Sequence, residues 1–256
     1  MLKGKNALVT GSTSGIGLAI AEQLASQGAN VMLNGFGDFE AAIQRVQSNG
    51  TIVRYHAADV SKPSEIEELV ATCVSNIGSV DILVNNAGIQ HVAAVEDFPI
   101  ERWDTIIAIN LSAAFHTTRC VLPEMKRRNW GRIINIASVH GLVASSNKSA
   151  YVAAKHGLVG FTKSVALETA TTGITVNAVC PGWVLTPLVE KQIEDRARTQ
   201  GITLEAAQHQ LLSEKQPSLQ FTTPQQVAEL TTFLCSSTAN NVRGVAWNID
   251  GGWLAQ

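Results

Sequence analysis

The chain has 256 residues, of which 45% are hydrophobic and 16% are charged, and its formal net charge at pH 7 is −2. This length suits one large α/β domain or two small ones, and no basic stripe or polybasic cluster favours binding to nucleic acid or to an anionic membrane. The four cysteines form no closely spaced pair, and the histidines and acids show no metal-ligand spacing, so we expect neither a disulfide framework nor a bound metal.

The first residues run directly into a strand-like segment, without the charged and apolar regions of a signal peptide. No apolar run of membrane-spanning length is evident in the rest of the chain. We therefore expect a soluble cytoplasmic protein with no membrane partner, whose cysteines are single buried thiols.

Short apolar runs alternate with amphipathic helical stretches along the whole chain. Strands are expected at residues 7–10, 30–34, 52–56, 82–84, 132–137, 175–179 and 245–249. Helices are expected at residues 16–27, 39–48, 63–76, 101–128, 150–171 and 223–235, with Ser61 as the cap of the third helix. Runs that are apolar on both faces and alternate with helices predict a parallel sheet covered on both sides. We therefore predict an α/β protein with one domain over residues 1–256.

One segment, residues 185–220, departs from this alternation and is called the lid segment below. It follows the sixth strand and is rich in charged and amide side chains, such as Glu190, Lys191, Gln192 and Glu194. Insertions after the carboxyl ends of parallel strands lie over the ligand crevice, which favours a helical substrate lid. The alternative is a solvated helical hairpin on the surface.

A glycine-rich turn joins the first expected strand to the first expected helix. Gly11, Gly15 and Gly17 allow backbone amides to approach a pyrophosphate, and the N-terminus of the following helix adds a favourable partial charge. The spacing G-x-x-x-G-x-G differs from the commoner dinucleotide fingerprint G-x-G-x-x-G, but the turn has the required place between strand and helix. A tight turn without a ligand is the alternative interpretation.

Tyr151 and Lys155 are four residues apart in an expected helix, and Ser138 precedes them. Positions i and i+4 share one face of a helix, so the lysine ammonium is expected beside the tyrosine phenol. A neighbouring cation favours the phenolate and lowers the pKa of a tyrosine. A phenol tuned in this way can take a proton from an alcohol, or return it, near neutral pH. The same pair occurs by chance on surface helices, so its chemical meaning depends on the other motifs.

Together these motifs resemble the short-chain dehydrogenase/reductase family. The resemblance rests on the turn from Thr10 to Gly17, Asn85-Asn86-Ala87-Gly88 after the fourth strand, Asn110, Ser138, Tyr151 with Lys155, and Pro181-Gly182 after the sixth strand. These matches span nearly the whole chain in the family's order. They imply a single-domain, Rossmann-like, doubly wound sheet of seven parallel strands, with NAD or NADP as cofactor.

The resemblance also implies a role for each catalytic residue. Tyr151 is the expected general acid/base, Ser138 is expected to hold the substrate oxygen, and Lys155 is expected to bind the nicotinamide ribose. Asn110 is expected to support a water-linked proton path. The residues expected to bind the cofactor are Gly11, Thr13, Gly15, Ile16, Gly17, Phe36, Asp59, Val60, Asn86, Ala87, Gly88, Tyr151, Lys155, Pro181, Gly182, Val184 and Thr186.

The sequence favours NAD over NADP. The extra phosphate of NADP needs a cation near the adenosine ribose. At the positions where family members supply this cation, the chain has Ser14 and the uncharged run 34–37. Many NAD-using members have an aspartate directly after the second strand, whereas here Asp38 comes later, so the ribose contact departs from the family pattern. Phe36 is expected to cover the adenosine. Asp59-Val60 matches the family's adenine-contacting pair, although an aspartate there is also typical of a turn.

The residues around the expected site favour a small hydroxy or keto acid as substrate. Gln90, His140 and Lys148 offer donors suited to a carboxylate, and Trp183 and Trp253 can wall a small pocket against water. Taken singly, each has an ordinary alternative, such as a solvated lysine or a packed histidine. The segments 88–91, 138–144, 147–151 and 211–218 resemble family members that act on a short 3-hydroxy acid with NAD. That resemblance implies a carboxylate site of Gln90, His140, Lys148 and Gln192, with Trp183 and Trp253 at the methyl end.

Two other functions are compatible with parts of the pattern. One is a family member that acts on a 3-ketoacyl thioester or a sugar. The absence of a cation for the NADP phosphate and the presence of side chains that can donate to a carboxylate argue against it. The other is a nucleotide-binding scaffold without chemistry, against which the intact Ser138, Tyr151 and Lys155 argue. The long helices at residues 101–128 and 150–171 resemble the family's dimer-forming pair, which implies a homotetramer.

Overall fold

A computed structural model describes residues 1–47 and 50–255 of the chain. Its centre is a sheet of seven parallel strands in the order β3-β2-β1-β4-β5-β6-β7. The strands are β1 (Asn6–Val9), β2 (Asn30–Asn34), β3 (Val53–His56), β4 (Ile82–Asn85), β5 (Gly131–Ile136), β6 (Ile174–Pro181) and β7 (Ala246–Ile249). The strand order reverses between β1 and β4, as in doubly wound folds, and the predicted fold class is confirmed.

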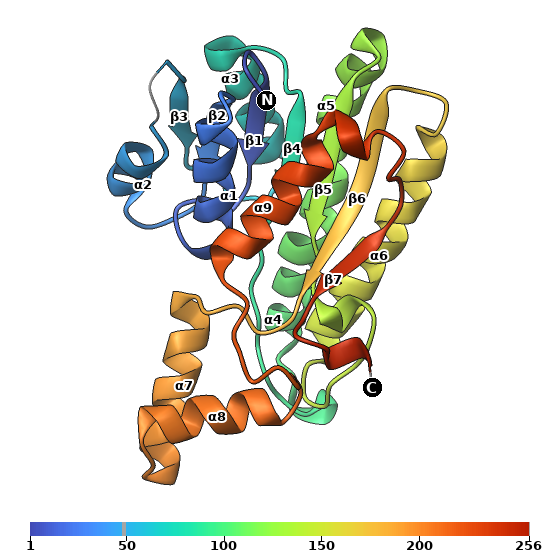
Figure 1. The fold of residues 1–256 in the computed structure, drawn as a ribbon. Coiled ribbons are helices and arrows are strands. Elements are labelled where there is room, and N and C mark those ends of the chain that lie inside the picture. The colour runs from blue at the N-terminus through green and yellow to red at the C-terminus, as the bar shows by residue number, and fades with distance from the viewer. Residues whose placement is uncertain (48–49, 256) are drawn as a thin grey trace.

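Helices cover both faces of the sheet (Figure 1). Ala7 and Val9 of β1 pack into a core shared with α1 (Gly15–Ser26), α2 (Phe39–Val46) and α9 (Pro224–Cys235). Leu8, between them in the sequence, packs into the opposite core, shared with α3 (Pro63–Ile77), α5 (Ala113–Arg128) and α6 (Ser149–Glu168). Because successive side chains of a strand point to opposite faces, covering both faces requires the uninterrupted apolar runs seen in the sequence.

The helix predicted at residues 101–128 is not one α-helix. It consists of α4 (Ile100–Ile107), a π-helical segment (Ala108–Ser112) and α5. Asn110 lies in the π-helical segment, where its Oδ1 accepts the Ile89 N–H and its Nδ2 donates to the Ile89 carbonyl, both at 2.9 Å. Single π-turns within α-helices are rare and are frequently found at functional sites. Here the π-turn contains the residue that holds the loop after β4.

The expectation that no apolar run reaches membrane-spanning length is wrong. The continuous run Ile100–Arg128 is long and apolar enough by length and composition, and 39% of its apolar window is buried within the protein. Core helices of soluble proteins can be equally long and apolar. Val121 and Met125 of this run belong to the core that α3, α5 and α6 share with the sheet. The run therefore gives only weak evidence for a membrane span.

Two smaller predictions also need comment. The helix expected at residues 39–48 is observed as α2, which ends at Val46, and Ser48 lies outside the described residues. Ser61 does not cap α3, because its backbone N–H and its hydroxyl both donate to Asp59 Oδ1, at 3.0 and 2.7 Å. The helix instead begins with Pro63 after Lys62, whose side chain makes no capping bond.

The lid segment contains two helices, α7 (Pro187–Gln200) and α8 (Leu204–Ser213), which project from the rest of the molecule (Figure 1). They bury a small apolar cluster of their own that includes Ile193 and Leu211, and Trp183 packs against it. Arg196 Nη1 also donates to Glu214 Oε1 at 2.6 Å. Both interpretations of this segment require a helical hairpin, which is therefore confirmed, whereas its movement as a lid stays a prediction.

Candidate active site

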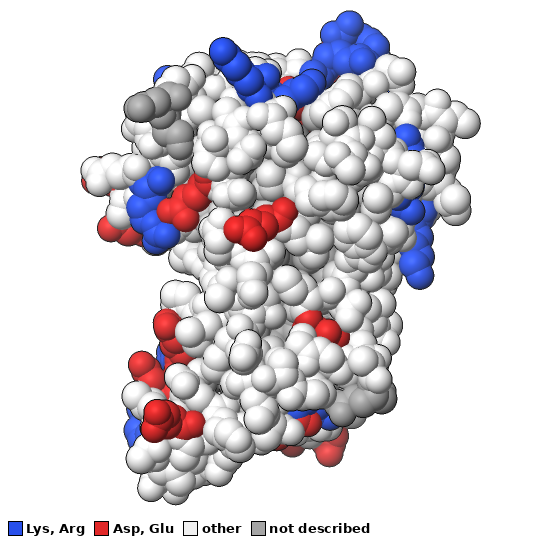
Figure 2. Space-filling model, viewed as in Figure 1, with Lys and Arg blue, Asp and Glu red and all other residues white. Residues whose placement is uncertain are grey.

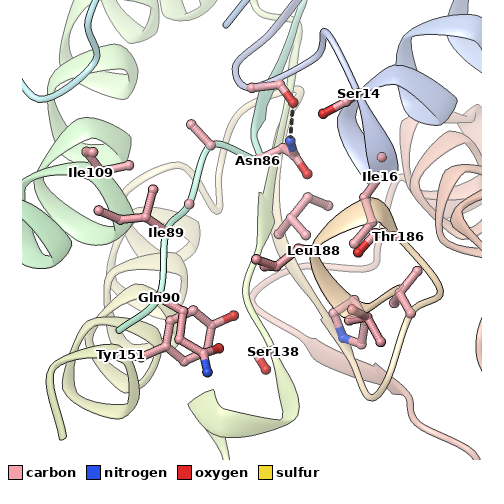
Figure 3. A pocket seen from close by; sticks show the side chains of 18 of the residues that line it. Ser14, Ile16, Asn86, Ile89, Gln90, Ile109, Ser138, Tyr151, Thr186 and Leu188 are labelled. Atoms are coloured by element: carbon pink, nitrogen blue, oxygen red, sulfur yellow. Dashed lines mark hydrogen bonds between the residues drawn. The ribbon is translucent and has the colours of Figure 1, made fainter. Parts of the chain in front are cut away.

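A cavity of about 460 Å³ opens at the carboxyl ends of the strands. Ligands of parallel α/β sheets bind at this end, next to the point where the strand order reverses. In Figure 3, Gln90 and Tyr151 lie on one side of the cavity, Thr186 and Leu188 lie on the other, and Ser138 lies between them. Every residue predicted to be catalytic or to bind cofactor or substrate lines this cavity, except Gly17 and Asn110.

One end of the cavity is formed by the N-terminus of α1. Gly11 and Gly15 have φ values of +61° and +55°, and a Cβ on Gly11 would lie 2.8 Å from Ala87 Cα. The cap residue Ser14 makes no side-chain capping bond, and the first turn of α1 holds no acidic residue. The first N–H groups of a helix have no partner within the helix, and together with the helix dipole they bind phosphate. This end of the cavity therefore fits the pyrophosphate of a dinucleotide.

Gly17 does not line the cavity and instead lets two segments approach each other. A Cβ at this position would lie 2.2 Å from the Gly11 carbonyl oxygen and 2.4 Å from Asn86 Nδ2. That Asn86 amide group donates to the carbonyls of Thr10 and Gly11, at 3.0 and 2.9 Å, and Figure 3 marks one hydrogen bond of this amide. The Thr10 hydroxyl in turn accepts the N–H of Asn86 at 3.0 Å. The glycine turn is thus fixed to the loop after β4 with Gly17 in a packing role, and a direct contact of Gly17 with the cofactor stays a prediction.

The adenosine end of the cavity is shaped by the turn after β2. The Thr13 hydroxyl donates to the Phe36 carbonyl at 2.5 Å, and the Tyr55 hydroxyl donates to the Gly35 carbonyl at 2.7 Å. Phe36 lines the cavity and its side chain is 70% exposed, and its contact with a bound adenosine stays a prediction. Asp38 does not line the cavity, because its carboxylate accepts the Ala41 N–H at 3.0 Å and caps α2.

Ser138 lies two residues after the end of β5 and caps a short 3-10 turn, and its side chain is buried. Its hydroxyl accepts the His140 N–H at 3.1 Å and interacts with the Tyr151 hydroxyl. The His140 ring lies between Ser138 Oγ, at 3.4 Å from Nδ1, and Ser145 Oγ, at 2.9 Å from Nε2. Burial, aided by the cation of Lys148, lowers the pKa of His140 to about 4. At neutral pH His140 is therefore an uncharged hydrogen-bonding group.

Lys155 lies behind Tyr151 on α6, with Nζ 5.6 Å from the centre of the tyrosine ring. The ammonium donates to the Ile136 carbonyl at 2.8 Å, and burial lowers the pKa of Lys155 to about 8. Burial also raises the pKa of Tyr151, and the hydrogen bond from Ser138 offsets only part of that effect. In the protein alone the net shift of the Tyr151 pKa is thus upward, and the lowering by Lys155 stays a prediction for the site with its ligands bound.

The predicted carboxylate site lies at the same end of the cavity. Lys148 Nζ is 5.2 Å from the centre of the Trp183 ring, which is within the range of a cation–π interaction. Burial lowers the pKa of Lys148, and the charge of Glu214 partly opposes this. The ring of Trp253 lies 6.0 Å from that of Trp183 and 5.4 Å from that of His140, centre to centre. These rings form an apolar wall beside the cation.

Some cavity-lining residues were not identified from the sequence. They are mostly apolar residues next to recognised motifs: Ala58, Ile89, Ile109, Ile136, Leu188 and Val189. Small apolar residues at strand ends and in a charged helix carry no signal that separates them from core positions. Asn110 was identified but does not line the cavity, since both ends of its amide are bonded to Ile89. Its predicted water path stays a prediction.

The chain belongs to the short-chain dehydrogenase/reductase family, because the family described as short chain dehydrogenase matches residues 5–197. Among curated proteins, the chain is 64% identical to the D-beta-hydroxybutyrate dehydrogenase of Cupriavidus necator, over 100% of both chains. It is 56% identical to the protein of that name from Rhizobium meliloti, over 98% of this chain and 99% of the relative. Among solved structures, an actinorhodin polyketide ketoreductase variant with NADPH is 38% identical, covers 99% of both chains and has a TM-score of 0.92.

Proposed function

We propose that the chain is an NAD-dependent oxidoreductase that interconverts (R)-3-hydroxybutyrate and acetoacetate, the activity that the sequence predicts. The observation that carries the proposal is the set of side chains that line one cavity. Ser138, Tyr151 and Lys155 line it together with side chains that can donate hydrogen bonds to a carboxylate, which are Gln90, His140, Lys148 and Gln192. The two relatives named D-beta-hydroxybutyrate dehydrogenase, similar over their whole length, support the same activity.

The side chains that line this cavity can perform the proton chemistry of alcohol oxidation. Tyr151 takes the hydroxyl proton, and Ser138 holds the same oxygen by a hydrogen bond. Lys155 adds positive charge behind the phenol, which favours the phenolate once the alcohol binds. The dinucleotide supplies the hydride acceptor when it is bound. In the reverse direction, the protonated Tyr151 donates to the ketone oxygen.

The carboxylate of the substrate faces the Lys148 cation and the uncharged donors around it. A carboxylate accepts from charged and neutral donors together, and the charged bond is the stronger one. Gln192 and Leu188 come from α7, so closing of the lid segment brings a further donor and an apolar cover to the same place. Water excluded in this way strengthens the ionic contact.

The cations of the cavity support NAD rather than NADP as the cofactor. Among the described residues that line it, Lys148 and Lys155 are the only lysines, no arginine is present, and both lysines lie at the substrate end. The adenosine end presents the carbonyls of Gly35 and Phe36, which already accept bonds from Tyr55 and Thr13. A ribose phosphate there would meet no positive charge.

The proposal is tested by following nicotinamide absorbance with both enantiomers of 3-hydroxybutyrate, using NAD and NADP in parallel. We expect turnover of the (R) enantiomer with NAD, and a kcat/KM at least about tenfold lower with NADP or with the (S) enantiomer. In the reductive direction, acetoacetate is compared with a 3-ketoacyl thioester. A preference for the thioester would identify a ketoacyl reductase instead, and no turnover of any of these compounds would favour a nucleotide-binding scaffold.

The proposal includes a cytoplasmic homotetramer. The described cysteines are all free, as in reducing compartments. On the face shown in Figure 2 most of the surface is uncharged, with basic side chains gathered along the top edge and acidic side chains over the middle and lower part. A surface hollow between α5 and α6 is lined by Phe115, Leu122 and Phe161, and the exposed Phe115 offers apolar area for a second copy. Light scattering is expected to give the mass of four chains, and a lower mass for Phe115→Glu. The mass of one chain for the native protein would refute the assembly.

A further inference from the structure

Gln216 is a buried polar residue at the base of the lid segment, and the chemistry above gives it no role. It follows the end of α8 and is only 1% exposed. Its Oε1 accepts the Trp183 N–H at 2.9 Å, and its Nε2 donates to the Gln220 carbonyl. Both ends of the amide are therefore bonded to backbone groups from two different parts of the chain.

Two glycines make room for this side chain. A Cβ on Gly182 would lie 2.6 Å from Gln216 Oε1, and a Cβ on Gly251 would lie 2.6 Å from Gln216 Cγ. Gly251 has a φ of +58°, a conformation that favours glycine. The chain after β6, the base of the lid segment and the turn after β7 thus meet around one buried amide.

Two of these three segments carry the apolar wall of the substrate site, and the base of the lid segment contacts both of them. Trp183 directly follows Gly182, and its ring packs against the cluster inside the lid segment. The Ser218 N–H donates to the Gly251 carbonyl at 3.0 Å, two residues before Trp253. Between these contacts, Leu219 has a φ of +52° and is 46% exposed. A residue other than glycine adopts this unfavourable conformation only where the surrounding structure imposes it, and such residues cluster at functional sites.

We propose that Gln216 is a positioning residue that holds the Trp183 and Trp253 rings at their observed separation and thereby limits the chain length of the accepted acid. The substrate class in this inference rests on the proposed function. The amide bonds the Trp183 backbone directly, and through the 216–220 turn it fixes the turn after β7 that precedes Trp253. Loss of the amide allows the Trp183 and Trp253 rings to move, so the space between them for the methyl group of the substrate becomes less well defined.

The first test measures the two rings without any substrate. The protein is labelled with 5-fluorotryptophan, and its five tryptophan signals are assigned by single Trp→Phe replacements. In Gln216→Leu, which keeps most of the volume but makes neither hydrogen bond, the signals of Trp183 and Trp253 are expected to shift or broaden. The signals of Trp103, Trp130 and Trp247 are expected to stay unchanged. Unchanged Trp183 and Trp253 signals in the folded variant overturn the proposal.

The second test measures specificity. Acetoacetate is compared with 3-oxopentanoate, which is one methylene longer, and a fitted apolar pocket separates such a pair by about 10- to 200-fold. We expect Gln216→Leu to reduce this ratio of kcat/KM values by about tenfold. Gln44→Leu, a change of an exposed glutamine on α2, is the matched control and is expected to leave the ratio unchanged. An unchanged ratio in Gln216→Leu contradicts the inference.

Gln216→Glu separates a specific role of the amide from a general loss of stability. A protonated glutamic acid has the same donor and acceptor as glutamine, so wild-type discrimination is expected at low pH. As the pH rises through the raised pKa of a buried carboxyl, the donor to the Gln220 carbonyl is lost and discrimination is expected to fall. A pH-independent ratio in this variant overturns the inference, also where Gln216→Leu does not fold. If the native chain fails to reduce acetoacetate, the proposed function is wrong, and the fluorine signals alone decide the role of Gln216.

Discussion

Replacement of Tyr151 by phenylalanine is expected to lower kcat for oxidation of (R)-3-hydroxybutyrate by about 10²- to 10⁴-fold, the usual contribution of a general acid/base. The change removes only the hydroxyl, because the ring can keep its edge contact with His140, at 5.9 Å between ring centres. NAD binding is expected to persist, since the glycine turn and Lys155 remain. Titration with the reduced cofactor and thermal unfolding show whether the variant is intact. Unchanged turnover in an intact variant would refute the proposed role of Tyr151.

The pH profile of the native protein provides the second part of this test. Because burial raises the pKa of Tyr151, the phenol is the main form at neutral pH in the protein alone. Oxidation requires the phenolate, so kcat/KM for hydroxybutyrate is expected to rise with pH. Reduction requires the phenol, so kcat/KM for acetoacetate is expected to fall as the pH rises through the same pKa. Any residual activity of Tyr151→Phe is expected to lack both slopes.

The alternation of strands and helices and the order of the motifs were enough to predict the sheet and most of the cavity. Because β1 is buried on both faces, the residues that it buries are apolar, which gives a continuous apolar run in the sequence. The glycine turn follows this strand because it leads directly into the N-terminus of α1. The resemblance to the family placed Ser138 beside Tyr151, whereas the spacing on one face of a helix placed Tyr151 near Lys155. These features depend on local pattern and topology, which a sequence displays directly.

The features that were missed depend on contacts between distant segments. The π-turn at Ala108–Ser112 leaves no mark in hydrophobic periodicity, since its extra residue becomes evident only through the bonds of Asn110 to Ile89. The direction in which the pKa of Tyr151 shifts depends on how deeply the phenol is buried, and the spacing of residues on a helix gives no measure of burial. Gln216 resembles an ordinary surface amide in a charged segment until the fold places it between Gly182 and Gly251.

Replacement of Lys148 by methionine is expected to raise the KM for acetoacetate by about 10- to 100-fold, with a smaller change in kcat. A hydrogen bond to a charged group contributes about 1.5–3 kcal/mol, and the carboxylate loses one such partner. Methionine is unbranched and polarisable, so it can fill the space beside the Trp183 ring over which Lys148 Nζ lies. Lys126→Met, a change of an exposed lysine at the far end of α5, is the matched control and is expected to leave KM unchanged.

Methyl acetoacetate extends this prediction, because it keeps the reacting ketone and lacks the charge. The native protein is expected to prefer the acid over the ester, and Lys148→Met is expected to lose most of that preference. Since Tyr151 and Ser138 act on the ketone oxygen in both compounds, the difference isolates recognition of the carboxylate from the chemical step. If Lys148→Met still prefers the acid over the ester, the carboxylate is bound by the neutral donors instead, which are Gln90, His140 and Gln192. The low pKa of His140 argues against that outcome, because an uncharged ring offers the weaker bond to an anion.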